Sequence, residues 1–152
     1  MTIVHLLEKN AREFPNDVAL VEINPEQPET RRITWSEFEL VEPTNRRHYR
    51  REITWGVFEE KANRLANMLT QNGIGKGNKV AILLMNCIEW LPIYFGILKS
   101  GATAVPLNFR YTAEEIKYCL ELSDADVLVH GPEFTGRIEQ IIDRVPRIRF
   151  SV

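Results

Sequence analysis

Residues 86–110 read NCIEWLPIYFGILKSGATAVPLNFR, and this stretch decides the class of fold. The side chains from Ile88 to Leu98 are apolar on almost every side, in a run too long for one strand and too short to span a membrane. Lys99 and Gly101 then form a helix-stop pattern, because the cation meets the negative end of the helix dipole and glycine tolerates a left-handed cap. The stretch therefore predicts a helix buried on more than one face, followed at once by a short buried strand over residues 103–107.

Pro92 leaves the start of this helix open. If the helix begins near Glu89, Pro92 lies in the first turn, where its missing N–H costs nothing. If Asn86 is the cap instead, the proline removes an interior hydrogen bond and kinks the helix. In both cases a helix that leads directly into a buried strand is one half of an α/β unit.

The same alternation continues along most of the chain. An amphipathic helix is expected over residues 3–13 and an apolar strand over residues 18–23. From residue 57 onward, helix and strand alternate at a spacing that implies right-handed crossovers and a mostly parallel sheet with helices on both faces. Because the chain ends on a strand, we expect the sheet to continue beyond Val152. The expected helices after residue 57 cover about 58–69, 88–98, 112–122 and 134–142, and the strands cover about 80–85, 103–107, 127–129 and 148–152.

An internal repeat interrupts this pattern. Residues 31–39, RRITWSEFE, return as residues 51–59, REITWGVFE, with Ile, Thr, Trp, Phe and Glu identical. Only the second copy continues into a helix with an apolar stripe, whereas Pro43 stops any helix that the first copy begins. We interpret the chain as one partial α/β domain, residues 1–152, in which the second copy occupies the structural position and an inserted duplicate spans about residues 31–50.

The two copies differ where the helix starts. Glu37 in the first copy would complete a capping box with Thr34, and Val57 stands at the corresponding place in the second copy.

Composition excludes some classes of partner. Lys plus Arg number 19 and Asp plus Glu number 21, so the charge balance gives no general reason to expect nucleic acid or an anionic membrane. The cluster RRHYRR at residues 46–51 has the residue types that bind phosphate-rich ligands or RNA, but a solvated hairpin is the favoured interpretation. Cys87 and Cys119 lack metal-ligand spacing and are interpreted as buried free thiols. The early charged residues are unlike a signal peptide and no apolar run reaches about 18 residues, so a cytoplasmic protein is expected.

Four stretches, in order and spacing, resemble the start of the adenylate-forming enzymes, the superfamily of acyl- and aryl-CoA ligases, nonribosomal peptide adenylation domains and luciferases. Arg110 followed by YTAEEI is most similar to the acid–CoA ligase branch, which includes the fatty-acyl-CoA synthetases. The resemblance covers nearly the whole chain outside residues 31–50 and implies an incomplete N-terminal subdomain of the adenylate-forming fold. The four stretches are ITWGVF at 53–58, ANRLA at 62–66, GNKVAILLMN at 77–86 and LKSGATAVPLN at 98–108.

The resemblance implies an ATP-dependent, AMP-forming ligation with Mg and CoA as cofactors. In such enzymes a small-molecule carboxylic acid and ATP give an acyl-adenylate and pyrophosphate, and the CoA thiol then displaces AMP. The family's phosphate-binding loop, its Mg-serving glutamate, its ribose-binding aspartate and its lid lysine do not occur in these 152 residues. Because acyl-adenylate chemistry needs preorganised charges around the reacting phosphates, we expect this chain by itself to be inactive. We assign it no catalytic residue, no metal ligand and no bound cofactor of its own. Long-chain fatty acid and aryl acid both remain open as substrates.

Few residues of the implied site fall within this chain. Arg110 matches a position that lies near the nucleotide phosphates of CoA in aryl-CoA ligases, and a guanidinium fork suits a phosphate. The alternative is that Arg110 pairs with Glu114 or Glu115 at the start of the next helix. Asn108 would shape the pocket through its backbone, or would serve only the turn after the strand.

The aromatic side chains of the central helix also have two interpretations. Trp90, Tyr94 and Phe95 would line an acyl pocket, but aromatic residues at this spacing on a buried helix are more often core.

A function of another class is a non-catalytic α/β module that binds a partner through an open sheet edge or through the duplicated segment. An unpaired edge strand would favour pairing with a second copy of the chain, giving a homodimer.

Overall fold

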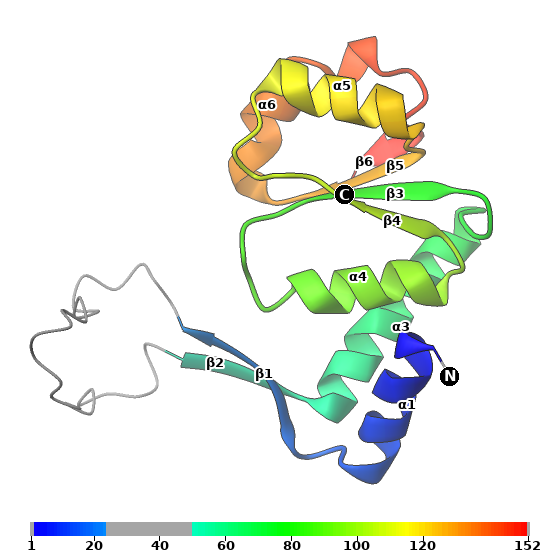
Figure 1. Cartoon of the computed structure of the whole chain (residues 1–152), viewed down its shortest axis with the longest axis vertical. Helices are drawn as coiled ribbons and strands as arrows, with labels where there is room; N and C mark the ends of the chain where they lie inside the picture. The colour runs from blue at the N-terminus through cyan, green and yellow to red at the C-terminus, as the bar shows by residue number, and fades with distance from the viewer. Residues whose placement is uncertain (1, 24–49, 152) are drawn as a thin grey trace, which may run out of the picture.

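A computed structural model describes residues 2–23 and 50–151, and it contains two sheets and the helices that cover them (Figure 1). The first sheet is an antiparallel pair, and the second is built of four strands. The elements in chain order are α1 (Ile3–Glu13), β1 (Val18–Ile23), β2 (Arg50–Thr54), α3 (Trp55–Gln71), β3 (Lys79–Leu83), α4 (Trp90–Lys99), β4 (Thr103–Pro106), α5 (Ala113–Ser123), β5 (Val127–His130), α6 (Thr135–Glu139) and β6 (Phe150–Ser151).

The four-stranded sheet is parallel throughout, in the order β4-β3-β5-β6. Its central strand β3 pairs Val80 with Ala104 of β4 on one side and with Val127 of β5 on the other. β3 is a strand covered on both faces, because four of its five residues, Val80–Leu83, are consecutive apolar side chains that are fully buried. The expected parallel sheet is therefore confirmed.

Helices cover both faces of this sheet, as predicted (Figure 1). Because successive side chains of a strand point to opposite faces, Val80 and Ile82 pack in the core beneath α3 and α4, together with Leu69 and Ile97. The alternate residues of β3 pack on the other side, in the core beneath α5 and α6. That second core contains Ala81, Leu83, Ile116, Leu120, Ile138 and Ile141.

The central helix α4 begins after Glu89, so the first alternative for Pro92 is confirmed. Pro92 is the third residue of the helix, within the first turn, and Ile93 is free to donate its N–H to the Glu89 carbonyl at 3.0 Å. At the other end Gly101 has φ of 84°, which a side chain would strain. The predicted glycine cap therefore ends α4 and turns the chain into β4.

Lys99 does more than face the helix dipole. Its Nζ lies 2.7 Å from Glu59 of α3 and 3.1 Å from Glu8 of α1, and the lysine side chain is only 8% exposed. Burial lowers the pKa of Lys99, but its hydrogen bonds to Glu59 and Glu8 outweigh that effect and raise the pKa above its ordinary value. The amine therefore ties three helices together as a cation.

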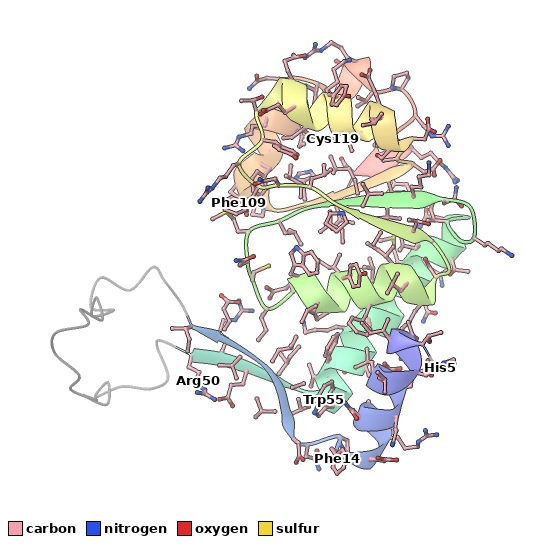
Figure 2. The ribbon with its side chains drawn as sticks, viewed as in Figure 1. His5, Phe14, Arg50, Trp55, Phe109 and Cys119 are labelled. Carbon is pink, nitrogen blue, oxygen red and sulfur yellow. The ribbon has the colours of Figure 1, made fainter. Side chains whose placement is uncertain are left out.

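The antiparallel hairpin of β1 and β2 was not predicted. Val21 lies opposite Glu52, and Ile23 lies opposite Arg50, which Figure 2 labels. The hairpin rests on a third, smaller core in which Phe58 meets Phe95 edge to face, with ring centroids 5.2 Å apart. Leu7 and Ala62 complete the buried part of this core, and Leu20, Ile53 and Trp55 pack against it.

The second copy of the repeat forms β2 and the first turns of α3, whereas residues 31–39 and most of the RRHYRR cluster lie outside the described residues. The role of the duplicate therefore stays a prediction.

Two further expectations need correction or refinement. Cys87 and Cys119 are free, as predicted, but each is half-buried and not fully buried. The helix expected over 134–142 is broken into α6 and two short 3₁₀ turns, Pro132–Phe134 and Ile142–Arg144. Among the described helices, none has the length and apolar character needed to cross a membrane.

Candidate functional site at the carboxyl edge of the sheet

The carboxyl ends of β3, β4 and β5 meet at one edge of the parallel sheet, on the left of the view in Figure 1. The Leu107 N–H donates to the Ile82 carbonyl at 2.8 Å, and the Gly131 N–H donates to the Leu83 carbonyl at 3.0 Å, so the three loops leave the sheet side by side. The chain passes from β3 to β4 on one side and then to β5 on the other side. In doubly wound folds, ligands bind outside such a point, where neighbouring loops diverge.

The loop after β4 carries both residues that the sequence singled out, Asn108 and Arg110. The Asn108 side-chain oxygen accepts the Arg110 N–H at 2.9 Å, and the Asn108 carbonyl accepts the Tyr111 N–H at 3.0 Å. These contacts form a turn stabilised by the asparagine, which is the structural role predicted as one alternative. The backbone of the loop is thereby fixed next to the sheet edge.

A residue that the sequence did not reveal, Arg137, anchors this loop from α6. Its Nη1 donates to the carbonyls of Phe109 and Tyr111, each at 2.9 Å, and its guanidinium lies 5.4 Å from the centre of the Phe134 ring. Arg137 follows Phe109 by 28 residues, so no local pattern signals the contact. Figure 2 labels Phe109 at the place where the loop leaves the sheet.

Arg110 itself is exposed, and its guanidinium lies 5.5 Å from the centre of the Phe109 ring. Glu114 pairs with Arg144, and the Glu115 carboxylate accepts from the Thr112 N–H and hydroxyl, each at 2.8 Å. The expected pairing of Arg110 with Glu114 or Glu115 is therefore wrong. Arg144 reaches Glu114 from the segment after α6, and Thr112 is the N-cap of α5 and binds Glu115 in a capping box. Within residues 2–23 and 50–151, no carboxylate forms a salt bridge with Arg110.

The loop after β3 is tied to the hairpin by a second set of charges. The Ile88 N–H donates to Glu22 at 2.8 Å, and Arg51 lies 3.5 Å from Glu22 and 2.6 Å from Glu89. The hydrogen bond to Glu89 raises the pKa of Arg51. Burial raises the pKa of Glu89, but the hydrogen bond from Arg51 and neighbouring effects outweigh it and lower the pKa. Both groups are therefore charged near neutral pH, and they hold the loop against β2.

An open groove of about 310 Å³ lies between this loop and β1. Burial raises the pKa of the Cys87 thiol in its wall, so the thiol stays protonated near neutral pH. The other lining residues are Leu20, Val21, Glu22, Ile23, Asn86, Ile88 and Leu91.

The aromatic residues of α4 belong to the core and not to this groove. Trp90 and Tyr94 stack at 5.4 Å and pack against the core beneath α3 and α4, and Phe95 is buried in the small core beneath the hairpin. The prediction that these residues are structural is confirmed.

Arg110 offers an exposed guanidinium on a fixed backbone, which fits an anionic group such as a phosphate. Among the described residues, no three His, Cys, Asp or Glu side chains gather in a way that could hold a metal ion. Arg110 is therefore the described residue at this edge that would suit an anionic group.

The four-stranded parallel sheet with helices on both faces makes this protein a doubly wound α/β module, a class that binds ligands at the carboxyl ends of its strands. Residues 7–149 match the family described as AMP-binding enzyme, which is nearly the whole length of the chain. The chain belongs to this family.

Curated relatives match part of the chain. The chain is 39% identical over 98 residues to a medium/long-chain-fatty-acid–CoA/3-oxocholest-4-en-26-oate–CoA ligase of Mycobacterium marinum, covering 64% of this chain and 18% of the relative. It is also 39% identical over 89 residues to the long-chain-fatty-acid–CoA ligase FadD13 of Mycobacterium tuberculosis, covering 59% of this chain and 18% of the relative. The chain thus spans about a fifth of the length of these relatives.

Solved structures agree with this assignment. A Mycobacterium tuberculosis fatty acyl CoA synthetase superposes with a TM-score of 0.76 at 26% identity, over 99% of this chain and 26% of that one. The N-terminal domain of FACL13 from the same organism superposes with a TM-score of 0.77 at 25% identity, over 100% of this chain and 33% of that domain. The chain is thus similar to the N-terminal part of proteins named as fatty-acid CoA ligases, the branch that the sequence motifs resemble.

Proposed function

We propose that this chain serves as the N-terminal α/β part of an ATP-dependent, AMP-forming acid–CoA ligase. The reaction joins a carboxylate to ATP to give an acyl-adenylate and pyrophosphate, and the CoA thiol then displaces AMP to form a thioester. The observation that carries the proposal is the family match over residues 7–149, together with relatives whose names are those of CoA ligases. The duplicate at about residues 31–50 is an insertion in this single domain.

We further propose a fatty acid as the substrate and the cytoplasm as the place of action. The curated relatives are named for medium- and long-chain fatty acids and for a steroid carboxylic acid. An aryl acid is the second candidate, because an anthranilate CoA ligase bound to anthranoyl-AMP superposes with a TM-score of 0.75 at 28% identity, over 97% of this chain and 24% of that one.

Within this chain, Arg110 is the residue proposed to contact CoA, through a nucleotide phosphate. Its guanidinium is exposed, forms no salt bridge to a described carboxylate and lies on a loop held by Asn108 and Arg137. A fixed backbone lowers the entropy lost when a long side chain grips an anion. Asn108 sets the turn that aims Arg110, and CoA when bound supplies the thiol that accepts the acyl group.

Binding measurements test the role of Arg110. Isothermal titration of this chain with CoA is compared with titration with pantetheine, which lacks the nucleotide phosphates. Arg110→Gln should weaken CoA binding about tenfold or more, as expected for one charged hydrogen bond, and leave pantetheine unchanged. Arg144→Gln, a surface arginine paired with Glu114, is the matched control and should bind CoA normally. Equal CoA affinity for the two variants would remove Arg110 from the proposed site.

The ligase proposal has a separate readout. AMP release is measured with panels of fatty and aryl acids, with and without CoA, on this chain and on the longest product of the same gene. We expect no AMP from this chain alone and acid-dependent AMP from any product that carries the remaining family motifs. Such a product releasing no AMP with any acid would contradict the proposal.

A further inference from the structure

The second copy of the repeat, residues 51–59, packs against one particular part of the fold, which we call the slot. It is formed by β1, by the turn over residues 14–17 and by the small core beneath the hairpin. Backbone contacts place the segment there: the Trp55 N–H donates to the Asp17 carbonyl and the Gly56 N–H donates to the Pro15 carbonyl, each at 3.0 Å. β2 adds a ladder of pairs to β1 that ends with Ile23 opposite Arg50.

The side chains that hold the segment in the slot are few. Phe58 is only 2% exposed and meets Phe95, and Ile53 and Trp55 pack on the same core. The Thr54 hydroxyl accepts the Val57 N–H at 3.3 Å and caps α3.

Two charged residues of the segment also bind outside it. Arg51 pairs with Glu22 and Glu89, and Glu59 pairs with Lys99 at 2.7 Å.

The first copy repeats all six of these contacting residues. Residues 30–39 lie outside the described part of the chain, so the comparison is one of sequence. Arg31, Ile33, Thr34, Trp35, Phe38 and Glu39 correspond to Arg51, Ile53, Thr54, Trp55, Phe58 and Glu59. Between positions 51 and 59 the copies differ only at 52, 56 and 57, and the side chains of Glu52 and Val57 are exposed. The identities therefore coincide with the contacts that the slot makes.

The differences at positions 56 and 57 have opposite effects on how well the first copy would fit the slot. Gly56 corresponds to Ser36, and a Cβ at Gly56 would lie 3.0 Å from the Pro15 carbonyl oxygen, so the slot disfavours the first copy there. Val57 corresponds to Glu37, which would return a hydrogen bond to the cap residue and favour the first copy. The second copy is the one found in the slot because only it continues without interruption into the rest of α3.

We propose that residues 30–39 are an alternative occupant of the slot in the same chain, replacing residues 50–59 in a minor conformation. In that conformation residues 50–59 leave the slot. The part of α3 that carries Ala62, Ala66 and Leu69 keeps its place on the sheet. The exchange costs roughly the four backbone hydrogen bonds of a new helix start, which keeps the second copy as the major occupant.

Two deletions of 20 residues test whether the slot accepts either copy. Removal of residues 30–49 leaves only the second copy, and removal of residues 40–59 joins the first copy directly to Glu60. Both variants should unfold cooperatively, with melting temperatures within a few degrees of each other. Failure of the second deletion to fold while the first one folds would overturn the proposal.

The exchange itself is tested in the full chain by pairing Phe58→Ala with Phe38→Ala. Phe38→Ala alone should leave the melting temperature unchanged, because the major occupant is intact. Phe58→Ala should lower the melting temperature less than truncation of a buried phenylalanine normally does, because the first copy can fill the slot with Phe38. The double variant should lower it by at least about 5 °C more, because neither copy then supplies the ring. Phe95→Ala is the control. Phe95 belongs to the wall of the slot and has no duplicate, so Phe38→Ala should add nothing to the effect of Phe95→Ala on the melting temperature.

Hydrogen exchange gives a second readout that does not depend on damage to the core. Opening of the slot exposes the amides of residues 50–58, so Phe38→Ala should slow their exchange in the otherwise unaltered chain. Additive melting shifts, an unfolded Phe58→Ala variant or unchanged exchange in Phe38→Ala would each overturn the proposal.

Discussion

Gly96 of α4 faces Ala62 and Leu65 of α3 without room for a side chain. A Cβ added to Gly96 would lie 2.8 Å from the Leu65 Cβ and 2.9 Å from the Ala62 carbonyl oxygen. Gly96→Ala therefore tests whether the position of α4 on α3 depends on this absence of a side chain. The alternative is that α4 shifts to accept a methyl group at no cost.

Two opposing effects set the magnitude. Alanine is favoured over glycine inside a helix by about 1 kcal/mol. Forcing a methyl group into a filled core costs about 1–3 kcal/mol, and the upper part of that range applies because one of the blocking atoms belongs to the backbone of α3. The net loss in the free energy of unfolding is about 1–2 kcal/mol, which lowers the melting temperature by roughly 2–8 °C in a chain of this size.

Urea unfolding followed by tryptophan fluorescence measures this loss, because Trp90 lies in α4 and packs against the neighbouring core. Gly136→Ala is the matched control: Gly136 lies in α6, and an added Cβ there would meet nothing within 4 Å. The control should be neutral or up to about 1 kcal/mol more stable than the wild type. Equal stability of the two variants would refute the reasoning, because it would show that α4 moves freely on α3.

Three further changes probe single contacts. Val57→Glu should complete the capping box with Thr54 and raise the free energy of unfolding by about 0.5–1 kcal/mol in urea, whereas Val57→Lys should not, and equal stability of the two would count against the box. Lys99→Met should cost about 1–3 kcal/mol by leaving Glu59 buried without its partner. Because the pKa of Lys99 is raised above 10.5, its stabilisation is complete below pH 10.5 and is lost as the pH rises through the folded-state pKa, so unfolding curves of the wild type and of Lys99→Met should converge only in that alkaline range. Arg137→Met should cost about 1–2 kcal/mol and speed amide exchange in the loop after β4, and unchanged exchange would show that the loop does not need this anchor.

Local patterns predicted most elements of the parallel sheet. The apolar run of β3, the glycine after α4 and the helix expected over about residues 112–122 depend on residues a few positions apart, and each appears as expected. The last predicted helix was less accurate, because Gly136 and the short spacing to Pro146 leave little length for a regular helix.

The candidate site was predictable only in part. Asn108 and Arg110 were found through a family motif, and the parallel order of the strands placed them at the carboxyl edge. Of the two alternatives for Arg110, pairing with Glu114 or Glu115 is wrong, because Arg144 binds Glu114 from a segment 30 residues away. Arg137, which fixes the loop, carried no local signal.

By itself, the sequence determined the alternation of helices and strands, the parallel sheet and the family. It could do so because hydrophobic periodicity, caps and motifs are local properties of the chain. Only the tertiary structure decided which charges meet. Arg51 reaches Glu22 and Glu89, Lys99 reaches Glu8 and Glu59, and the hairpin joins strands separated by 26 residues, 24–49, of the chain. Such pairs form because packing brings distant elements together, and the geometry of that packing is written in no short stretch of sequence.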